Sequence, residues 1–293
     1  MSARVERGAV DLAAAVSPPR PGGRASGRVL PGGQRAGRHL SVGLISVVTL
    51  AVLLAVWWGV TAAGLIEPLF LPGPGEVLRR LARLVTAGYM DATLWEHAWA
   101  SLQRIGLAMI AAIVLAVPAG IAIGRSRLAR GILDPLIEFY RPIPPLAYLP
   151  LIVIWFGIGE LAKVLLIFLA IFAPVAIATA NGVRHVAPVR LRAAQSLGAT
   201  PRQLLWHVIL PNALPEILTG LRIGLGVGWS TLVASELVAA TRGLGFMVQS
   251  AGQFLATDVV VAGILVIAAI AVALELGLRA LQRRLVPWHG TGH

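Results

Sequence analysis

The chain has no cysteine and only one lysine, Lys163, among its 293 residues. The absence of cysteine excludes disulfides, thiolate metal sites and cysteine nucleophiles. Lys163 follows no glycine-rich loop, so the chain lacks a GxxxxGK[ST] phosphate loop for binding ATP. It also lacks an HExxH motif, and all its histidines lie outside the apolar runs, which leaves Ser230 without a nearby base. We therefore expect no enzyme activity, and no cofactor or metal on this chain.

Charged residues are also scarce, at 13% of the chain, whereas soluble domains contain about 25%. Hydrophobic residues make up 57%, and the mean hydropathy is +0.80. This composition predicts a membrane protein surrounded by lipid. The net charge is +12, but the basic residues collect at the ends of apolar runs, as orientation signals do. We therefore expect no nucleic-acid partner.

The apolar runs predict an all-α membrane protein with six transmembrane helices, each long enough to cross a core of about 30 Å. Residues 1–40, rich in Gly, Pro and Arg, predict a disordered cytoplasmic tail. The membrane domain is expected over 41–286, with a cytoplasmic tail at 287–293. The predicted spans are about 41–66, 103–124, 137–158, 162–183, 220–241 and 259–280. Arg-rich connections at 125–130, 184–202 and 279–284 place both termini inside.

One polar segment stands out between two apolar runs, Leu191–Pro211, which reads LRAAQSLGATPRQLLWHVILP. Local rules predict a short helix that ends at Gly198, because Gly is a frequent C-terminal residue there. Thr200 and Pro201 then predict a second helix, which Pro211 ends or kinks. The two helices form a projecting knob on the cytoplasmic face, or else an ordinary amphipathic surface loop.

Several residues in or beside the apolar runs are candidates for packing or passage. Gly220, Gly224 and Gly228 recur every four residues and predict a helix face for close packing. Glu236 is an acid within a predicted span, where it either contacts substrate or makes a structural hydrogen bond. With Ser230 and Ser235 it forms the candidate translocation pathway. The four prolines of 142–150 indicate irregular backbone that borders a conduit or kinks a helix. Residues 76–85 have the pattern of an amphipathic interfacial helix.

The polar segment resembles the EAA loop of binding-protein-dependent ABC importer permeases. That pattern has an acid, two alanines, three residues, a glycine, nine residues, an apolar residue and Leu-Pro. The matching residues here are Arg192, Ala193, Ala194, Gly198, Val208, Leu210 and Pro211. Arg192 stands in the place of the acid, and Val208 in that of the usual Ile. From about residue 41 onward the chain is similar to the sulfonate, nitrate and taurine branch.

The resemblance implies a type I ABC importer permease fold with a cytoplasmic EAA coupling helix in the loop 184–213. It implies a multi-pass inner-membrane subunit that translocates taurine or a related alkanesulfonate. The implied partners are a second permease copy, cytoplasmic ATP-binding subunits that hold ATP and Mg, and a periplasmic substrate-binding protein. The alternatives are a permease for nitrate or another small organic anion, and a proton-coupled carrier that uses Glu236.

Overall fold

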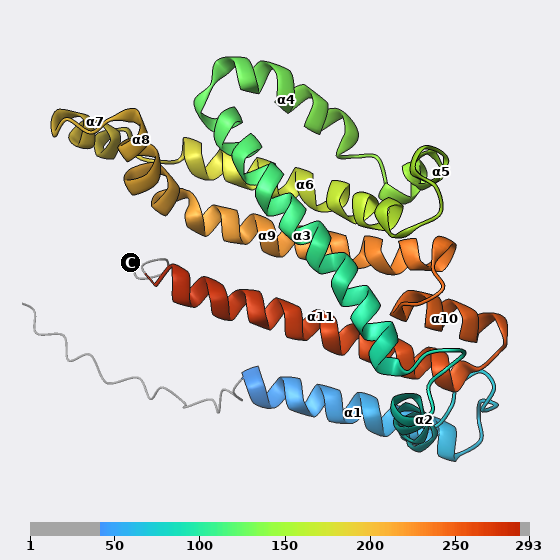
Figure 1. Cartoon of the computed structure of the whole chain (residues 1–293). Coiled ribbons are helices and arrows are strands. Elements are labelled where there is room, and N and C mark those ends of the chain that lie inside the picture. The colour runs from blue at the N-terminus through green and yellow to red at the C-terminus, as the bar shows by residue number, and fades with distance from the viewer. Residues whose placement is uncertain (1–41, 288–293) are drawn as a thin grey trace, which may run out of the picture. The chain divides into compact units, whose positions relative to one another are not determined.

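The computed structural model describes residues 42–287, so the predicted tail of residues 1–40 and most of the predicted C-terminal tail lie outside the described residues. The chain divides into two compact units, residues 1–49 and 50–293. Of the first unit, the described residues form the beginning of α1. The helices are α1 (Val42–Ala62), α2 (Pro74–Thr86), α3 (Leu94–Arg125), α4 (Arg127–Tyr140), α5 (Pro145–Phe156), α6 (Glu160–Arg184), α7 (Pro188–Ser196), α8 (Pro201–Gln203), the π-helical turn η1 (Leu204–Ile209), α9 (Leu210–Ala239), α10 (Leu244–Gln253) and α11 (Thr257–Leu285) (Figure 1).

Five helical stretches are long and apolar enough to cross a membrane, which confirms the all-α membrane fold. They are α1, α3, α6, the continuous stretch from α8 to α9, and α11. The third predicted span, 137–158, differs from the single helix expected. Here α4 and α5 meet at a bend of 104°, and they count as a sixth span only if the bent pair is taken together. The break at residues 141–144 contains two of the four prolines, whose missing N–H groups favour such an interruption.

The helix α6 packs against both α3 and α9, and small residues make these contacts close. On α3 small residues recur every four positions along one face, at Ala108, Ala112, Ala116, Gly120 and Gly124, and the last two lie against α6. A Cβ atom on Gly120 would lie 2.5 Å from the carbonyl oxygen of Ala176 on α6. The opposite face of α3 carries large apolar side chains such as Ile110, which is 60% exposed. Small residues toward the protein and large ones toward lipid are typical of membrane helices.

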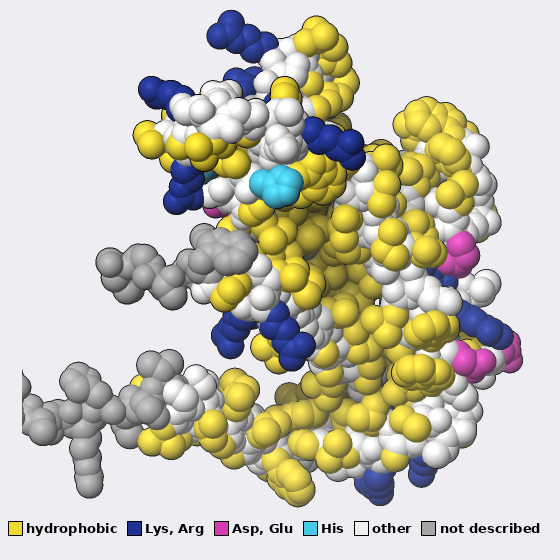
Figure 2. All heavy atoms as spheres, turned by 60° about the vertical axis from the view of Figure 1, so that its left-hand side comes forward, with side chains coloured by type: hydrophobic (Ala, Val, Ile, Leu, Met, Phe, Trp, Pro, Cys, Tyr) yellow, Lys and Arg dark blue, Asp and Glu magenta, His cyan; other side chains and the backbone are white. Residues whose placement is uncertain are grey.

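The two ends of the helical bundle formed by α3, α6, α9 and α11 differ in their connections. At one end, called the α7 end here, Figure 1 places α7 and α8, the turn from α3 to α4 and the C-terminal end of α11. The opposite end, called the α10 end, holds α2 and α10. The Arg-rich segments 125–130, 184–202 and 279–284 therefore share the α7 end. Figure 2 shows hydrophobic side chains over much of the visible face, with Lys and Arg side chains in separate groups.

Two short helices at the α10 end extend the sequence predictions. The amphipathic segment 76–85 is helical within α2, but Val77 and Leu84 are only 1% exposed. These two side chains pack inside the protein, mainly against α11, whereas Leu78 and Val85 of the same segment are 65% and 59% exposed, so the interfacial role stays a prediction. An ion pair of 3.2 Å between Arg80 and Asp258 fixes the polar side of the same contact. The helix α10 has no counterpart among the predicted elements.

Candidate functional site

The polar segment predicted from the sequence forms a capped turn between α7 and α8. The last turn of α7 closes with two backbone bonds, from the Gly198 N–H to the Gln195 oxygen (2.9 Å) and from the Ala199 N–H to the Ala194 oxygen (3.1 Å). This pair of bonds requires a left-handed backbone conformation at the residue that follows the helix, and Gly198 has a φ of 79°. The backbone conformation is therefore the reason for a glycine here. Lack of space is not, because a Cβ atom at this position would have no neighbouring atom within 4 Å.

The second helix starts at Thr200 and continues without a break into the membrane-spanning helix. The Thr200 hydroxyl accepts a bond from the Gln203 N–H (3.4 Å), and the Thr200 N–H donates to the Gln203 side chain (2.8 Å). Pro211 does not end this helix, because α8, η1 and α9 form one helical stretch. The wider turn of η1 precedes Pro211, and the Leu210 N–H already donates five residues back, to Leu205.

The residues of the EAA-like pattern separate into an exposed group and a packed group. Ala194, Val208 and Leu210 pack partly buried against the hydrophobic core, and Pro211 is half-buried beside them. Arg192, Ala193 and Gly198 are exposed instead. Two apolar side chains that the pattern did not single out project from the same surface: Leu197 is 89% exposed and Val189 is 73% exposed. The exposed group is thus available to another protein, while the packed group attaches the segment to α9.

A polar connection also joins α7 to the start of α9. The Arg190 guanidinium donates to the Asn212 side-chain oxygen, and the Asn212 amide donates to the Val208 carbonyl at 2.6 Å. This connection was not predicted, because the two residues are far apart in sequence and neither belongs to the EAA-like pattern. It gives the exposed helix α7 a direct contact with the base of a spanning helix.

Glu236 lies at the α10 end, at the centre of a buried charged network, and none of its surface is exposed. Its Oε1 accepts bonds from the Ser101 hydroxyl (2.8 Å) and from Arg104 Nη1 (2.6 Å). Its Oε2 accepts from the Gly245 N–H (2.8 Å). Arg104 also binds Glu160 through two contacts of 2.6 and 2.8 Å. Both carboxylate oxygens of Glu236 thus have protein partners, as in the structural alternative for this residue.

The candidate pathway residues do not converge on one space. Ser235 is buried and donates to the Leu232 carbonyl (2.8 Å), whereas Ser230 is exposed and donates to the Gly226 carbonyl (3.2 Å). The predicted glycine face, by contrast, lies along one contact with α6. A Cβ atom on Gly220 would lie 2.5 Å from Ala178 Cβ, and one on Gly228 would lie 2.6 Å from Ile171 Cγ1. Gly224 is similarly close, at 3.0 Å from Ile171 Cγ2.

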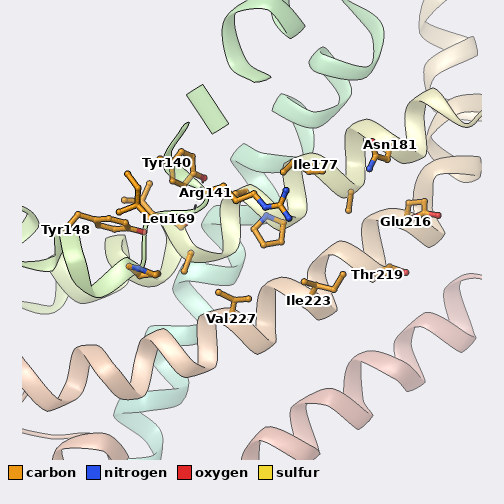
Figure 3. Close-up of a pocket in the computed structure, with 16 residues that line it drawn as sticks. Tyr140, Arg141, Tyr148, Leu169, Ile177, Asn181, Glu216, Thr219, Ile223 and Val227 are labelled. Carbon is orange, nitrogen blue, oxygen red and sulfur yellow. Dashed lines mark hydrogen bonds between the residues drawn. The ribbon is translucent and has the colours of Figure 1, made fainter. Parts of the chain in front are cut away.

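A cavity of about 430 Å³ lies between the break of α4 and α5, the middle of α6 and the first half of α9. In Figure 3, Tyr148 and Leu169 lie toward one end and Asn181 and Glu216 toward the other, with Arg141 between them. The volume falls within the range of about 300–1,000 Å³ that is usual for small-molecule sites. Of this cavity, the sequence indicated only the irregular proline run 142–150, which was expected to border a conduit or kink a helix. Neither Arg141 nor Glu216 was a candidate site residue in the sequence analysis.

Comparisons with known proteins identify the family. Residues 112–287 match the family model of the binding-protein-dependent transport system inner membrane component. The chain is 70% identical to the taurine transport system permease protein TauC of Escherichia coli (strain K12), over 84% of this chain and 90% of that protein. It is 35% identical to the putative aliphatic sulfonates transport permease protein SsuC of Bacillus subtilis (strain 168), over 82% and 86%. It is 30% identical to the nitrate import permease protein NrtB of Synechocystis, over 82% and 88%.

A solved structure supports the fold independently of close sequence identity. A chain of the MetNI methionine ABC transporter, in an inward-facing conformation, superimposes with a TM-score of 0.59 at 19% identity. The match covers 67% of this chain and 99% of that chain. The predicted importer permease fold is therefore confirmed, at the level of the arrangement of helices.

Proposed function

This chain belongs to the binding-protein-dependent transport system inner membrane components and is a permease subunit of an ABC transporter, and on that premise we propose that it imports taurine. The similarity that carries the proposal is the 70% identity to a taurine permease, against 35% and 30% to aliphatic sulfonate and nitrate permeases. Other alkanesulfonates form the wider substrate class, since they share the sulfonate group. Nitrate is the weaker alternative on the same comparison.

The α7–α8 turn is the proposed docking site for a separate ATPase subunit. Its support is the division between exposed residues, above all Leu197 and Ala193, and packed residues that continue into α9. Because this Leu197 side chain is 89% exposed, its burial in a groove of a partner protein would remove apolar surface from water and favour binding. Movement of the ATPase would reach α9 through the continuous helix and through the contact between Arg190 and Asn212. Arg192 would face the partner with a positive charge where the family pattern has an acid.

We assign the α7 end to the cytoplasm. Three Arg-rich segments share that end, and cytoplasmic connections of membrane proteins are enriched in Arg and Lys. Both termini then lie inside, and the α10 end faces the periplasm, where a substrate-binding protein delivers taurine. A second permease copy and two ATP-binding subunits, which hold ATP and Mg, complete the transporter.

A proton-coupled carrier is a poorer explanation of Glu236. A proton-binding carboxylate needs access to water, but this one is buried, and both its oxygens accept bonds from protein donors. Family membership also favours an ATP-driven mechanism over a proton gradient.

Reconstitution tests the proposal. The chain is placed in proteoliposomes with its ATPase subunits, and radiolabelled taurine uptake is measured with ATP inside and binding protein outside. We expect uptake that requires all three protein components and is unchanged when an uncoupler removes the proton gradient. Uptake by the permease alone, or uptake that stops with the uncoupler, would contradict it. Nitrate and a longer alkanesulfonate, added as competitors, establish the substrate class.

A further inference from the structure

The cavity beside the break of α4 and α5 contains two charged side chains with no charged partner. Among residues 42–287, no carboxylate lies within ion-pair distance of Arg141, and no cation lies within that distance of Glu216. The buried network at the α10 end differs, because Arg104, Glu160, Lys163 and Glu236 form ion pairs among themselves. Arg141 and Glu216 instead line one cavity, in which neither is neutralised by a side chain of residues 42–287.

Arg141 is exposed and lies beside the middle of a membrane-spanning helix. In Figure 3 it is placed between Leu169 and Ile177 along α6, and both residues belong to the central part of that spanning helix. A guanidinium remains charged at all physiological pH values, and a charge in the bilayer interior is unfavourable unless it faces a water-filled path or a counter-ion. The irregular backbone of residues 141–144 imposes the same condition, since it too requires water or protein around it.

The cavity continues from Arg141 toward the α7 end. It follows α6 from Leu169 to Asn181, a length of about 18 Å at 1.5 Å per residue, and α9 from Val227 back to Glu216. Glu216 and Asn181 therefore lie nearer the α7 end than Arg141 does (Figure 3). The lining carries one cation and one anion at separate positions, with Tyr140, Tyr148 and Thr219 as further polar groups.

We propose that this cavity is a transient binding site for a zwitterionic sulfonate on its way through the permease, with Arg141 holding the sulfonate and Glu216 attracting the ammonium. Arg matches the geometry, because a guanidinium donates two parallel bonds to the oxygens of a tetrahedral anion. The Glu216 carboxylate accepts from an ammonium, which also interacts favourably with the faces of tyrosine rings. The inference rests on the proposed function for the identity of the substrate, whereas the anion site itself rests on the geometry.

The first test separates passage through the permease from capture by the binding protein. Uptake of taurine is measured in proteoliposomes with the full transporter for Arg141→Gln, Arg141→Lys and Glu216→Gln. The matched controls are Arg127→Gln and Glu138→Gln, which change exposed α4 residues outside the cavity lining. We expect the maximal rate to fall about tenfold or more for Arg141→Gln, with KM unchanged, because the binding protein sets KM. Arg141→Lys restores part of the rate, and Glu216→Gln lowers it less than Arg141→Gln.

The second test does not depend on transport and uses the absence of cysteine from the chain. A single Thr219→Cys variant, assembled with its ATPase subunits, is treated with a methanethiosulfonate that carries an ethylsulfonate group or with the uncharged methyl reagent. We expect the anionic reagent to be favoured, and this preference to fall severalfold when Arg141→Gln is added. Millimolar taurine is expected to slow both reactions. A preference that does not depend on Arg141 would overturn the anion site.

The outcomes also distinguish this inference from the proposed function. If the wild-type transporter imports taurine but Arg141→Gln matches Arg127→Gln, the cavity site is refuted and the proposed function stands. If the wild-type transporter does not import taurine while the labelling preference depends on Arg141, the anion site stands and the proposed substrate is refuted. Co-purification of each variant with the ATPase subunits identifies variants that fail to fold. If Arg141→Gln is among them, the Thr219→Cys variant with Arg141 intact decides, because equal reaction with the anionic and the uncharged reagent would refute the anion site.

Discussion

Replacing Glu236 with Gln is expected to destabilise the protein strongly, because this substitution removes a buried charge and keeps its shape. Glu236 accepts three bonds from Ser101, Arg104 and the Gly245 backbone, at 2.8, 2.6 and 2.8 Å. All three partners donate. A glutamine amide has one accepting oxygen and one donating nitrogen, so in either orientation its NH₂ group faces at least one of these donors. The substitution therefore leaves a donor facing a donor inside a water-free site.

The magnitude follows from what Arg104 retains. Breaking a buried ion pair by removing one partner costs about 3–5 kcal/mol. Arg104 keeps its two contacts to Glu160, at 2.6 and 2.8 Å, so the lower end of that range applies. A loss of about 3 kcal/mol corresponds to a decrease of about 6–12 °C in the unfolding midpoint for a domain of this size. Glu160→Gln is the informative comparison: the Glu160 side chain is 63% exposed, but it is the partner of the buried Lys163, so its replacement is expected to cost about 1–3 kcal/mol, less than that of Glu236 because the Gln oxygen still accepts a bond.

The assay is thermal unfolding of the detergent-purified protein at a fixed scan rate, with the folded fraction measured by size-exclusion chromatography. Glu138→Gln, an exposed change on α4, serves as the control for the loss of one negative charge. A midpoint for Glu236→Gln within about 2 °C of the wild type, or a larger decrease for Glu160→Gln than for Glu236→Gln, would refute the reasoning. Either result would mean that the network does not hold the α10 end together.

Three further predictions concern packing and coupling. Gly220→Ala is expected to lower stability by about 1–3 kcal/mol, because the new Cβ would lie 2.5 Å from Ala178 Cβ. Gly226→Ala on the same helix is the control, since its Cβ would meet no atom within 4 Å. Equal unfolding midpoints of the two variants in a thermal scan would contradict the packing role of Gly220. Gly198→Val is expected to abolish both taurine uptake and co-purification of the ATPase, because a φ of 79° is unfavourable for a β-branched residue. Gly198→Asn is expected to retain both, because Asn tolerates this conformation. Normal association of the valine variant with the ATPase would exclude docking through this turn. Arg190→Ala is expected to lower taurine uptake severalfold, because it removes the contact between α7 and Asn212. The ATPase should still co-purify, because the exposed Leu197 remains. Uptake at the wild-type rate would show that this contact does not transmit movement of the ATPase to α9.

The local features of this protein could be predicted from the sequence because their causes are local. The apolar runs required helices in a bilayer, since every backbone group there must be bonded within its own segment. Gly198, Thr200 and Pro201 indicated a turn between two helices, and the structure places it between α7 and α8, because capping depends only on neighbours along the chain. The glycine spacing on α9 likewise depends only on helical periodicity. The equivalent stripe on α3, from Ala108 to Gly124, had the same period and was not recognised among the many alanines of that run.

The partners of the charged residues, by contrast, were decided only by the tertiary structure. Glu236 was recognised as an exceptional residue, but its partners Ser101 and Arg104 are more than 130 positions away, and no local rule connects them. The same reason applies to Arg190 with Asn212 and to the cavity that holds Arg141 and Glu216. Composition and periodicity determined that the chain crosses a membrane and where its polar turn lies. How the helices pack decides which charged side chains are paired and which line a cavity. The reason is that electrostatic energy depends on the distance between charges in space and not along the chain.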